Sequence, residues 1–278
     1  MAKDKEDLRK GCRLPDSVIC VDGLSIVFGG LRAVSGFSCE LARGELVGLI
    51  GPNGAGKTTV FNMLSGVYTP TEGTIRYVDR RGRAHDAHAM KPHQLASCGV
   101  ARTFQNIRLF GNLSVEDNVR IALHARREAG VLDALFRTGR FYRDEERLLA
   151  RAHELLALFR IDGKAKELAR NLPYGEQRKL EIARALACDP QLLLLDEPAA
   201  GMNPQETKEL MELIALVRSR FSLTILLIEH DMKLVMGICE RVIVLDYGRT
   251  IAAGPPAEIR EDPAVIKAYL GEEAMIDA

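Results

Sequence analysis

The sequence predicts an α/β protein built on a mainly parallel β-sheet, with a helical region inserted into the chain. Short apolar runs alternate with helical patterns over much of the length, which is typical of strands joined by crossover helices. The region from about Ser114 to Asn171 breaks this alternation, because helical periodicity dominates there. The chain of 278 residues is long enough to bury a large core.

Composition excludes several functional classes. Lys+Arg and Asp+Glu both number 38, so the chain lacks the basic excess of most nucleic-acid-binding proteins. The six cysteines form no CxxC pair and no disulfide framework, which favours a reducing compartment. No apolar run reaches roughly 18 residues, and the N-terminal stretch MAKDKEDLRKG is charged. We therefore expect neither a membrane-spanning helix nor a secretion signal.

Individual elements follow from short-range patterns. Residues 1–17 are polar, and we expect them to form a loose N-terminal arm. A helix is expected after Gly56, with Val60, Phe61 and Leu64 facing inward, and another around Leu210–Val217. Short β-branched or leucine-rich runs predict strands. The expected strands are 18–21, 25–28, 45–50, 74–78, 192–195, 224–228 and 241–245.

One long helix of the middle region carries a clear apolar stripe on an otherwise charged sequence. Residues at i, i+4, i+7 and i+11 of a helix share one face, so these side chains are predicted to pack against neighbouring helices. The stripe consists of Leu148, Leu149, Ala152, Leu155, Leu156 and Phe159.

The strongest functional motif is a glycine-rich loop at Gly51–Thr58, which follows an expected strand and precedes an expected helix. It matches the pattern GxxxxGK[ST], in which backbone N–H groups and the helix N-terminus surround phosphate oxygens. Lys57 is expected to reach the β- and γ-phosphates, and the Thr58 hydroxyl is expected to bind Mg²⁺.

A second motif is the run Leu192–Leu195, which ends in Asp196 and Glu197. An apolar strand ending in acids places them at the carboxyl edge of a parallel sheet, where phosphate loops also lie. Asp196 is expected to hold Mg²⁺ directly or through water, and Glu197 to polarise an attacking water molecule.

Further motifs occur around these two, and their order along the chain narrows the family. Together they resemble the ATP-binding subunits of ABC transporters over about residues 18–255. The resemblance implies a P-loop NTPase fold with a RecA-like parallel-sheet core, an N-terminal antiparallel β-subdomain, an inserted helical subdomain at about 110–175 and a C-terminal tail at 256–278. The additional motifs are Phe28, Gln105 within Thr103–Asn106, the segment Leu172–Gln177, and His230 within Glu229–Asp231.

The same resemblance assigns roles to residues, with ATP and Mg²⁺ as the cofactors. Phe28 would stack on adenine with Val34 as a second contact, although a core phenylalanine is the competing interpretation. Gln105 would touch Mg²⁺ and the attacking water, and His230 would contact the γ-phosphate. Gly175 and Glu176 would face the nucleotide of a partner cassette. The nucleotide-binding loop would comprise Asn53, Gly54, Ala55, Gly56, Lys57, Thr58 and Thr59.

Two departures from the family pattern are visible. The common form LSGGQ is here Leu172–Glu176, in which Pro173 lacks both the serine hydroxyl and a backbone N–H. Asn203 stands where the family usually has aspartate. The lost hydroxyl suggests that this cassette pairs with a different cassette whose signature segment is intact.

Several longer strings are similar to the ATPases of bacterial branched-chain amino acid importers with Tyr-Gly in the signature segment. This resemblance implies a peripheral protein on the cytoplasmic face of the inner membrane, with a second ATPase subunit, two permeases and, indirectly, a periplasmic binding protein. The alternatives are a lipopolysaccharide-export ATPase, a urea or amide importer ATPase and, with less support, a soluble ABC ATPase. The strings are 101–110, 174–186, 198–204, 228–236 and 268–271.

Overall fold

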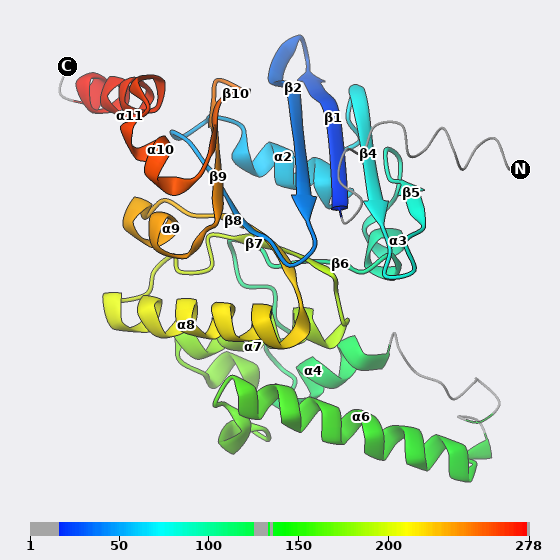
Figure 1. Ribbon diagram of the computed structural model, residues 1–278. Coiled ribbons are helices and arrows are strands. Elements are labelled where there is room, and N and C mark those ends of the chain that lie inside the picture. Colours follow the sequence, from blue (N-terminus) through cyan, green and yellow to red (C-terminus); the bar gives the residue numbers. More distant parts are fainter. Residues whose placement is uncertain (1–16, 125–132, 134–135, 277–278) are drawn as a thin grey trace, which may run out of the picture. The chain divides into compact units, whose positions relative to one another are not determined.

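The computed structural model describes residues 17–124, 133 and 136–276, with side chains to 269 (Figure 1). The expected arm at 1–17 therefore lies outside the described residues except for Ser17. The chain forms two compact units. Unit 1 takes its described residues from Met1–Arg102, Gln191–Pro198 and Ile214–Ala278, and unit 2 takes its described residues from Thr103–Pro190 and Ala199–Leu213.

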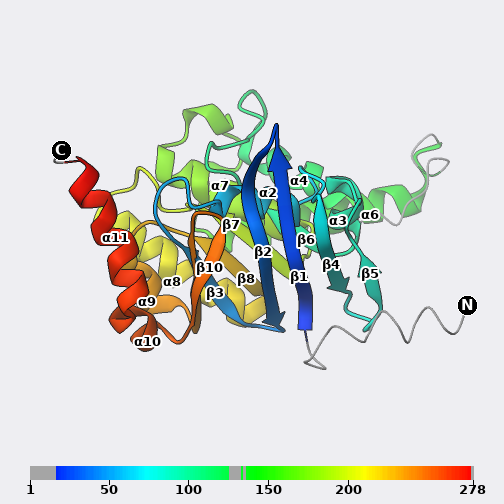
Figure 2. The same ribbon diagram turned by 90° about the horizontal axis from the view of Figure 1, so that it is seen from above.

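Unit 1 contains an antiparallel sheet in the order β2-β1-β4-β5. Its strands are β1 (Ser17–Phe28), β2 (Leu31–Ala42), β4 (Glu72–Val78) and β5 (Ala84–Asp86). Figures 1 and 2 show β1 between β2 and β4. The two short runs expected on either side of Gly23 are one strand, because irregular register between Val21 and Leu24 lets the strand continue past the glycine.

The second sheet of unit 1 has the order β10-β9-β3-β8-β7-β6. It is parallel except for β10, which pairs antiparallel with β9. Every residue of β3, β7 and β8 is buried, as continuous apolar runs predict for central parallel strands. The strands are β3 (Leu46–Ile50), β6 (Val100–Arg102), β7 (Leu192–Asp196), β8 (Thr224–Ile228), β9 (Arg241–Asp246) and β10 (Arg249–Gly254).

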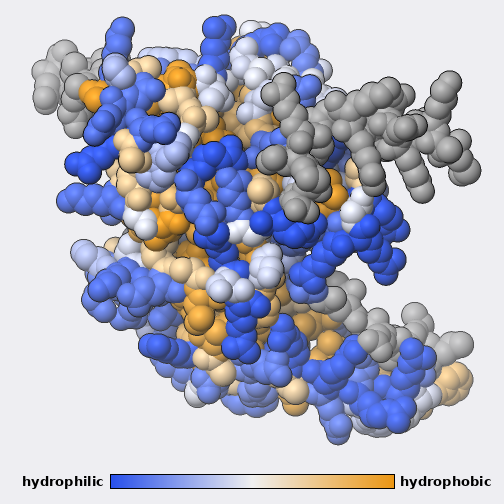
Figure 3. All heavy atoms as spheres, in the orientation of Figure 1, coloured by the Kyte–Doolittle hydropathy of each residue, from blue (hydrophilic) through white to orange (hydrophobic). Residues whose placement is uncertain are grey.

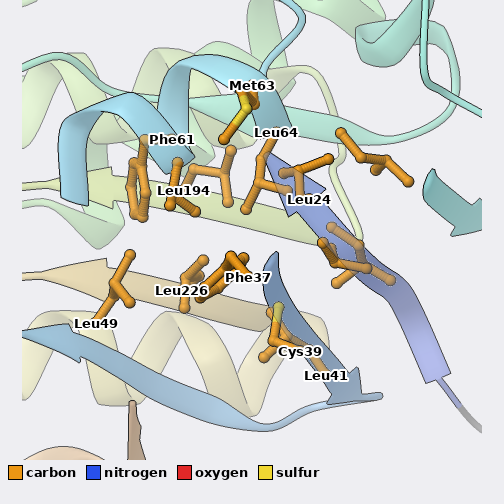
Figure 4. Close-up of a cluster of buried hydrophobic side chains, with 14 of the residues drawn as sticks. Leu24, Phe37, Cys39, Leu41, Leu49, Phe61, Met63, Leu64, Leu194 and Leu226 are labelled. Atoms are coloured by element: carbon orange, nitrogen blue, oxygen red, sulfur yellow. The ribbon is translucent and has the colours of Figure 1, made fainter. Parts of the chain in front are cut away.

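One hydrophobic cluster joins the two sheets to helix α2 (Lys57–Leu64). Figure 4 shows Phe61 of α2 facing Leu194 of β7, and Phe37 of β2 beside Leu226 of β8. All four side chains are fully buried. Because α2 begins at the end of the glycine-rich loop, this packing fixes the loop relative to the strands around it.

Unit 2 is largely helical in its described residues. It contains α4 (Val115–Leu123), α6 (Gly139–Leu158) and α7 (Tyr174–Ala187), with short 3-10 turns at Asp162–Lys164 and Ala169–Asn171. The apolar stripe packs as expected, since Leu148, Ala152, Leu155, Leu156 and Phe159 are buried and Leu149 is partly buried. Hydrophilic side chains cover the position of α6 in Figure 3.

The remaining helices are α3 (Pro92–Ser97), α8 (Pro204–Phe221), α9 (Met232–Ile238), α10 (Pro256–Glu261) and α11 (Pro263–Ile276). Among the helices of residues 17–124, 133 and 136–276, none is both long and apolar enough to span a membrane. The expected α/β class, with one antiparallel and one mainly parallel sheet and an inserted helical region, is confirmed.

Candidate nucleotide-binding and hydrolysis site

The glycine-rich loop joins the end of β3 to the start of α2, and its glycines are required by its shape. Gly51 has a φ of 148°, and a Cβ added there would lie 2.0 Å from the carbonyl oxygen of Leu245. Gly56 has a φ of 101° and caps α2, where a Cβ would lie 3.0 Å from the Ala33 oxygen. Neither position accepts a side chain, so the loop keeps its tight curve against β9 and β2.

Lys57 lies inside this curve. Its Nζ donates hydrogen bonds to the carbonyl oxygens of Gly51, at 2.6 Å, and Pro52, at 2.8 Å. The side chain is buried, whereas Asn53, Gly54 and Thr58 are exposed, Gly56 and Thr59 are partly exposed and Ala55 is buried. An anion that enters the loop therefore meets a cation already placed there, together with the positive end of α2.

Asp196 ends β7, and its carboxylate forms a buried ion pair. The Arg102 Nη2 lies 2.8 Å from the Asp196 Oδ2, and the two side chains are 7% and 3% exposed. The other terminal nitrogen of Arg102 donates to Asn62 Oδ1 at 2.8 Å and to Ser65 Oγ at 2.7 Å. Arg102 thus connects the expected metal-binding acid to helix α2.

Glu197 and His230 follow the neighbouring strands β7 and β8 and meet at the same sheet edge. The His230 Nε2 lies 2.5 Å from the Glu197 Oε1, and the imidazole is half exposed. The two side chains therefore face each other within hydrogen-bond distance. Glu197 has a left-handed φ of 48°, and its amide donates to the Ile228 carbonyl. The strained backbone and the histidine together fix the direction of the carboxylate.

Phe28 lies at the end of β1 and is 43% exposed, so it is not a core phenylalanine. Its ring meets the Tyr68 ring edge to face, with centroids 5.2 Å apart. A flat ligand could stack on such an exposed ring. Val34, in contrast, is fully buried, and its Cγ2 packs beside Gly56.

Gln105, Gly175 and Glu176 belong to unit 2. Gln105 is exposed, Gly175 is buried at the start of α7, and Glu176 is held by Lys164 through hydrogen bonds of 2.8 and 2.6 Å. Pro173 occupies the N-cap of α7 and provides no side-chain cap. The structure thus brings Lys57, Asp196, Glu197 and His230 together with the loop in unit 1.

Sequence reasoning missed three charged residues that contact expected functional residues, namely Arg102 in unit 1 and Lys164 and Arg178 in unit 2. Arg102 pairs with Asp196, Lys164 pairs with Glu176, and Arg178 bonds the backbone at Gln105. Arg102 and Arg178 lie within the strings 101–110 and 174–186 that resemble the importer ATPases, so this resemblance could have marked both arginines as candidates. Their partners could not be predicted, because each pairing joins distant parts of the sequence.

Comparison with known proteins decides the family. Residues 34–200 match the family described as ABC transporter, and residues 249–275 match the family described as branched-chain amino acid ATP-binding cassette transporter. The chain belongs to the ABC transporter family. ATP binding and ATP hydrolysis coupled to transport are the activities of its ATP-binding subunits, so the expected enzyme class is confirmed.

Several individual proteins are similar over most of the chain. The high-affinity branched-chain amino acid transport ATP-binding protein LivG of Salmonella typhimurium is 50% identical over 92% of this chain and 98% of its own length. BraF of Pseudomonas aeruginosa, with the same description, is 46% identical over the same shares. The lipopolysaccharide export system ATP-binding protein LptB of Acidithiobacillus ferridurans is 39% identical over 86% and 90%.

Among solved structures, the ADP conformation of MJ1267, an ATP-binding cassette of an ABC transporter, aligns with a TM-score of 0.78 at 26% identity. The alignment covers 92% of this chain and 99% of that one. The expected P-loop ABC ATPase fold is therefore confirmed.

Proposed function

We propose that this chain is the ATP-hydrolysing subunit of a bacterial importer of branched-chain amino acids. The cluster of Lys57, Asp196, Glu197 and His230 around one glycine-rich loop supports the hydrolytic part of the proposal. The substrate class rests on the similarity to LivG and BraF and on the match of residues 249–275. We take the cassette as residues 18–255, with the helical subdomain at about 110–175 and a tail at 256–278.

The proposed chemistry is in-line attack of water on the γ-phosphate of ATP. The exposed Phe28 ring supports the adenine, and residues Asn53–Thr59 surround the phosphates. The second adenine contact expected at Val34 does not fit, because this side chain is fully buried beside Gly56. Lys57 exchanges its carbonyl partners for phosphate oxygens and stabilises the charge that develops in the transition state. Glu197 orients and polarises the attacking water, and His230 fixes the Glu197 carboxylate and reaches the γ-phosphate. Gln105 is a further contact of the attacking water.

Magnesium fits the residues proposed for it. The exposed Thr58 hydroxyl and the Asp196 carboxylate are oxygen donors, and the Gln105 side chain also offers an oxygen, which is the ligand type that Mg²⁺ prefers. When bound, the ion would neutralise charge on the phosphates. The ion pair with Arg102 holds the Asp196 carboxylate in one orientation.

The proposed assembly is a pair of cassettes on the cytoplasmic face of the inner membrane, bound to two permease subunits that receive solute from a periplasmic binding protein. Each ATP would lie between the loop of one cassette and the signature segment, residues 172–176, of the other. Pro173 offers no hydroxyl there, whereas Gly175 and Glu176 begin a helix whose N-terminus favours phosphate. We therefore propose a second, different cassette as the partner.

Three experiments test this function. Lys57→Ala should weaken ATP binding in a direct titration, and unchanged affinity would contradict the loop assignment.

For the transporter, the chain should be recovered from gently solubilised membranes with its partners identified by mass. Two permeases, a second cassette and an amino-acid-binding protein are expected. Recovery of lipopolysaccharide-export proteins instead would favour the function of the LptB relative. A tight ATP-dependent homodimer of Glu197→Gln would argue against pairing with a different cassette.

A further inference from the structure

Arg178 is an unusual charged residue, because it lies among the largest fully buried side chains of the protein at 1% exposure. It stands on the first turns of α7, and its guanidinium donates to two successive backbone carbonyls. Nη1 donates to the Phe104 oxygen at 2.6 Å, and Nη2 donates to the Gln105 oxygen. A planar guanidinium holds both acceptors in one fixed geometry, which a lysine ammonium does not.

Glu181 lies one turn further along α7 and completes the contact with the same loop. Its Oε2 pairs with Arg178 Nη1 at 3.1 Å, and its Oε1 accepts from the Arg108 amide at 3.2 Å. The pKa of the Glu181 carboxyl is raised by burial, although hydrogen bonds from the Arg108 and Phe104 amides and the Arg178 charge act in the opposite direction. The segment from Phe104 to Arg108 is thus bound to α7 at both of its ends.

Tyr174 connects this pair to the signature segment. Its hydroxyl accepts a hydrogen bond from Arg178 Nη2 at 3.1 Å, across one helical turn. Its ring also packs on Gly201, where an added Cβ would lie 3.4 Å from Cε1. Tyr174 is 44% exposed, so its ring reaches the surface of α7 while its hydroxyl lies against the buried pair.

A buried ion pair is poor evidence for stability alone, because apolar residues of similar volume often pack as well at lower desolvation cost. Packing of α7 would not require a charge there. Fixing the backbone of a loop requires hydrogen-bonding groups, since carbonyl oxygens need donors and amides need acceptors, and charged groups form the stronger of these bonds. The donors and acceptors of Arg178 and Glu181 are directed at that backbone.

We propose that Tyr174, Arg178 and Glu181 are positioning residues that fix the Gln105 backbone to the signature helix α7. When a partner's nucleotide contacts the signature segment, displacement of Tyr174 and α7 is transmitted to the backbone of Gln105 through these bonds. The transmission step rests on the proposed function, in which Gln105 contacts the attacking water. The fixing of the loop does not depend on it.

The first test measures backbone amide exchange in the purified full chain. In Arg178→Lys and in Glu181→Gln, exchange of the Arg108 and Phe104 amides should rise by about ten- to hundredfold, the range expected when hydrogen bonds to charged groups weaken. Tyr174→Phe removes only a hydroxyl from an exposed ring, so it should raise the exchange of these amides less. The control is Lys179→Met, a cation one residue along α7 that pairs with Glu209 at 3.8 Å.

Unchanged loop exchange in folded Arg178→Lys and Glu181→Gln would overturn the proposal. If Arg178→Lys fails to fold, the Glu181→Gln and Tyr174→Phe variants still decide it. A general loss of stability would raise exchange throughout α4, α6 and α7, whereas loss of positioning raises it in residues 104–108.

The second test measures ATP hydrolysis by the full chain in the complex with which it co-purifies. Arg178→Lys should lower kcat by about ten- to a hundredfold, the usual cost of a displaced catalytic group, with the KM for MgATP within about twofold. In a Gln105→Ala background the same change should have little further effect. If the reductions in kcat caused by Arg178→Lys and by Gln105→Ala multiply in the double variant, the two residues act independently and the transmission step is overturned. If Gln105→Ala hydrolyses ATP normally, its proposed role fails, while the exchange result still decides the fixing of the loop.

Discussion

The buried pair of Arg102 and Asp196 allows a quantitative test of the site. Arg102→Met keeps the length of the side chain but leaves the Asp196 carboxylate, 3% exposed, without this cation. Removing one partner of a buried ion pair costs about 3–5 kcal/mol, because the remaining charge stays desolvated. Asn62 and Ser65 also lose a donor, so we expect a loss near the upper end of that range.

An exposed pair in the same unit provides a matched control. Arg32 and Glu72 form two hydrogen bonds of 3.0 and 3.1 Å, with side chains 44% and 53% exposed. Exposed pairs contribute about 0–1 kcal/mol, since water solvates either charge when its partner is removed. Arg32→Met should therefore change the free energy of unfolding far less than Arg102→Met does.

The assay is equilibrium urea unfolding at pH 7, followed by circular dichroism, for Arg102→Met, Asp196→Asn, the double variant and Arg32→Met. The double variant should be more stable than Arg102→Met, because asparagine leaves no unpaired charge, with a coupling energy of about 2–3 kcal/mol. If Arg102→Met costs no more than Arg32→Met, or if the two single losses simply add, the reasoning from burial is refuted.

Three other predictions concern catalysis, the loop and pH. Glu197→Gln should bind ATP within a few-fold of the wild type but hydrolyse it about 10²- to 10⁴-fold more slowly, and near-normal turnover would remove Glu197 from its role. Gly51→Ala should destabilise the chain by more than about 2 kcal/mol in thermal unfolding, because its Cβ meets a carbonyl oxygen at 2.0 Å, whereas Gly237→Ala, with open space and an ordinary φ in α9, should not. For Asp79, burial raises the pKa of the carboxyl, but hydrogen bonds within its turn, including those from Arg83, lower it well below 3.8. A lowered pKa stabilises the fold above the unfolded value, and this contribution is lost as pH falls through the folded value. The stability difference between wild type and Asp79→Asn should thus be constant above about pH 5 and shrink at lower pH, and a difference independent of pH would exclude the carboxylate as its source.

Local sequence patterns predicted the glycine-rich loop and the strands β1, β3, β4, β7, β8 and β9, because each depends on neighbouring residues. The strands β2, β5, β6 and β10 were not predicted. Short, continuous apolar runs such as Leu192–Leu195 favour buried strands, and the spacing of Gly51, Gly56 and Lys57 is a property of one turn. The uninterrupted course of β1 past Gly23 was not predicted, because the irregular register that allows it depends on pairing with β2.

The buried arginine contacts within each unit could not be predicted for a different reason. Arg102 bonds Asp196 across 94 positions, and Arg178 bonds Gln105 across 73. No periodicity relates such residues, and a charged residue at the end of a strand or on a helix is usually solvated. Only the fold reveals that both arginines are buried and where they are directed.

The proposed function gives the Lys57 ammonium a second set of acceptors, the phosphate oxygens, besides the Gly51 and Pro52 carbonyls that it bonds in this structure. While the Lys57 Nζ donates to the Gly51 and Pro52 carbonyls, these two hydrogen bonds maintain the curve of the loop. Phosphate oxygens would have to compete with the two carbonyl oxygens for the same N–H donors. Measured ATP affinity is then the difference between two bonded states, not the full strength of a lysine–phosphate contact. Lys57 therefore maintains the shape of the loop before any nucleotide arrives, in addition to supplying a positive charge.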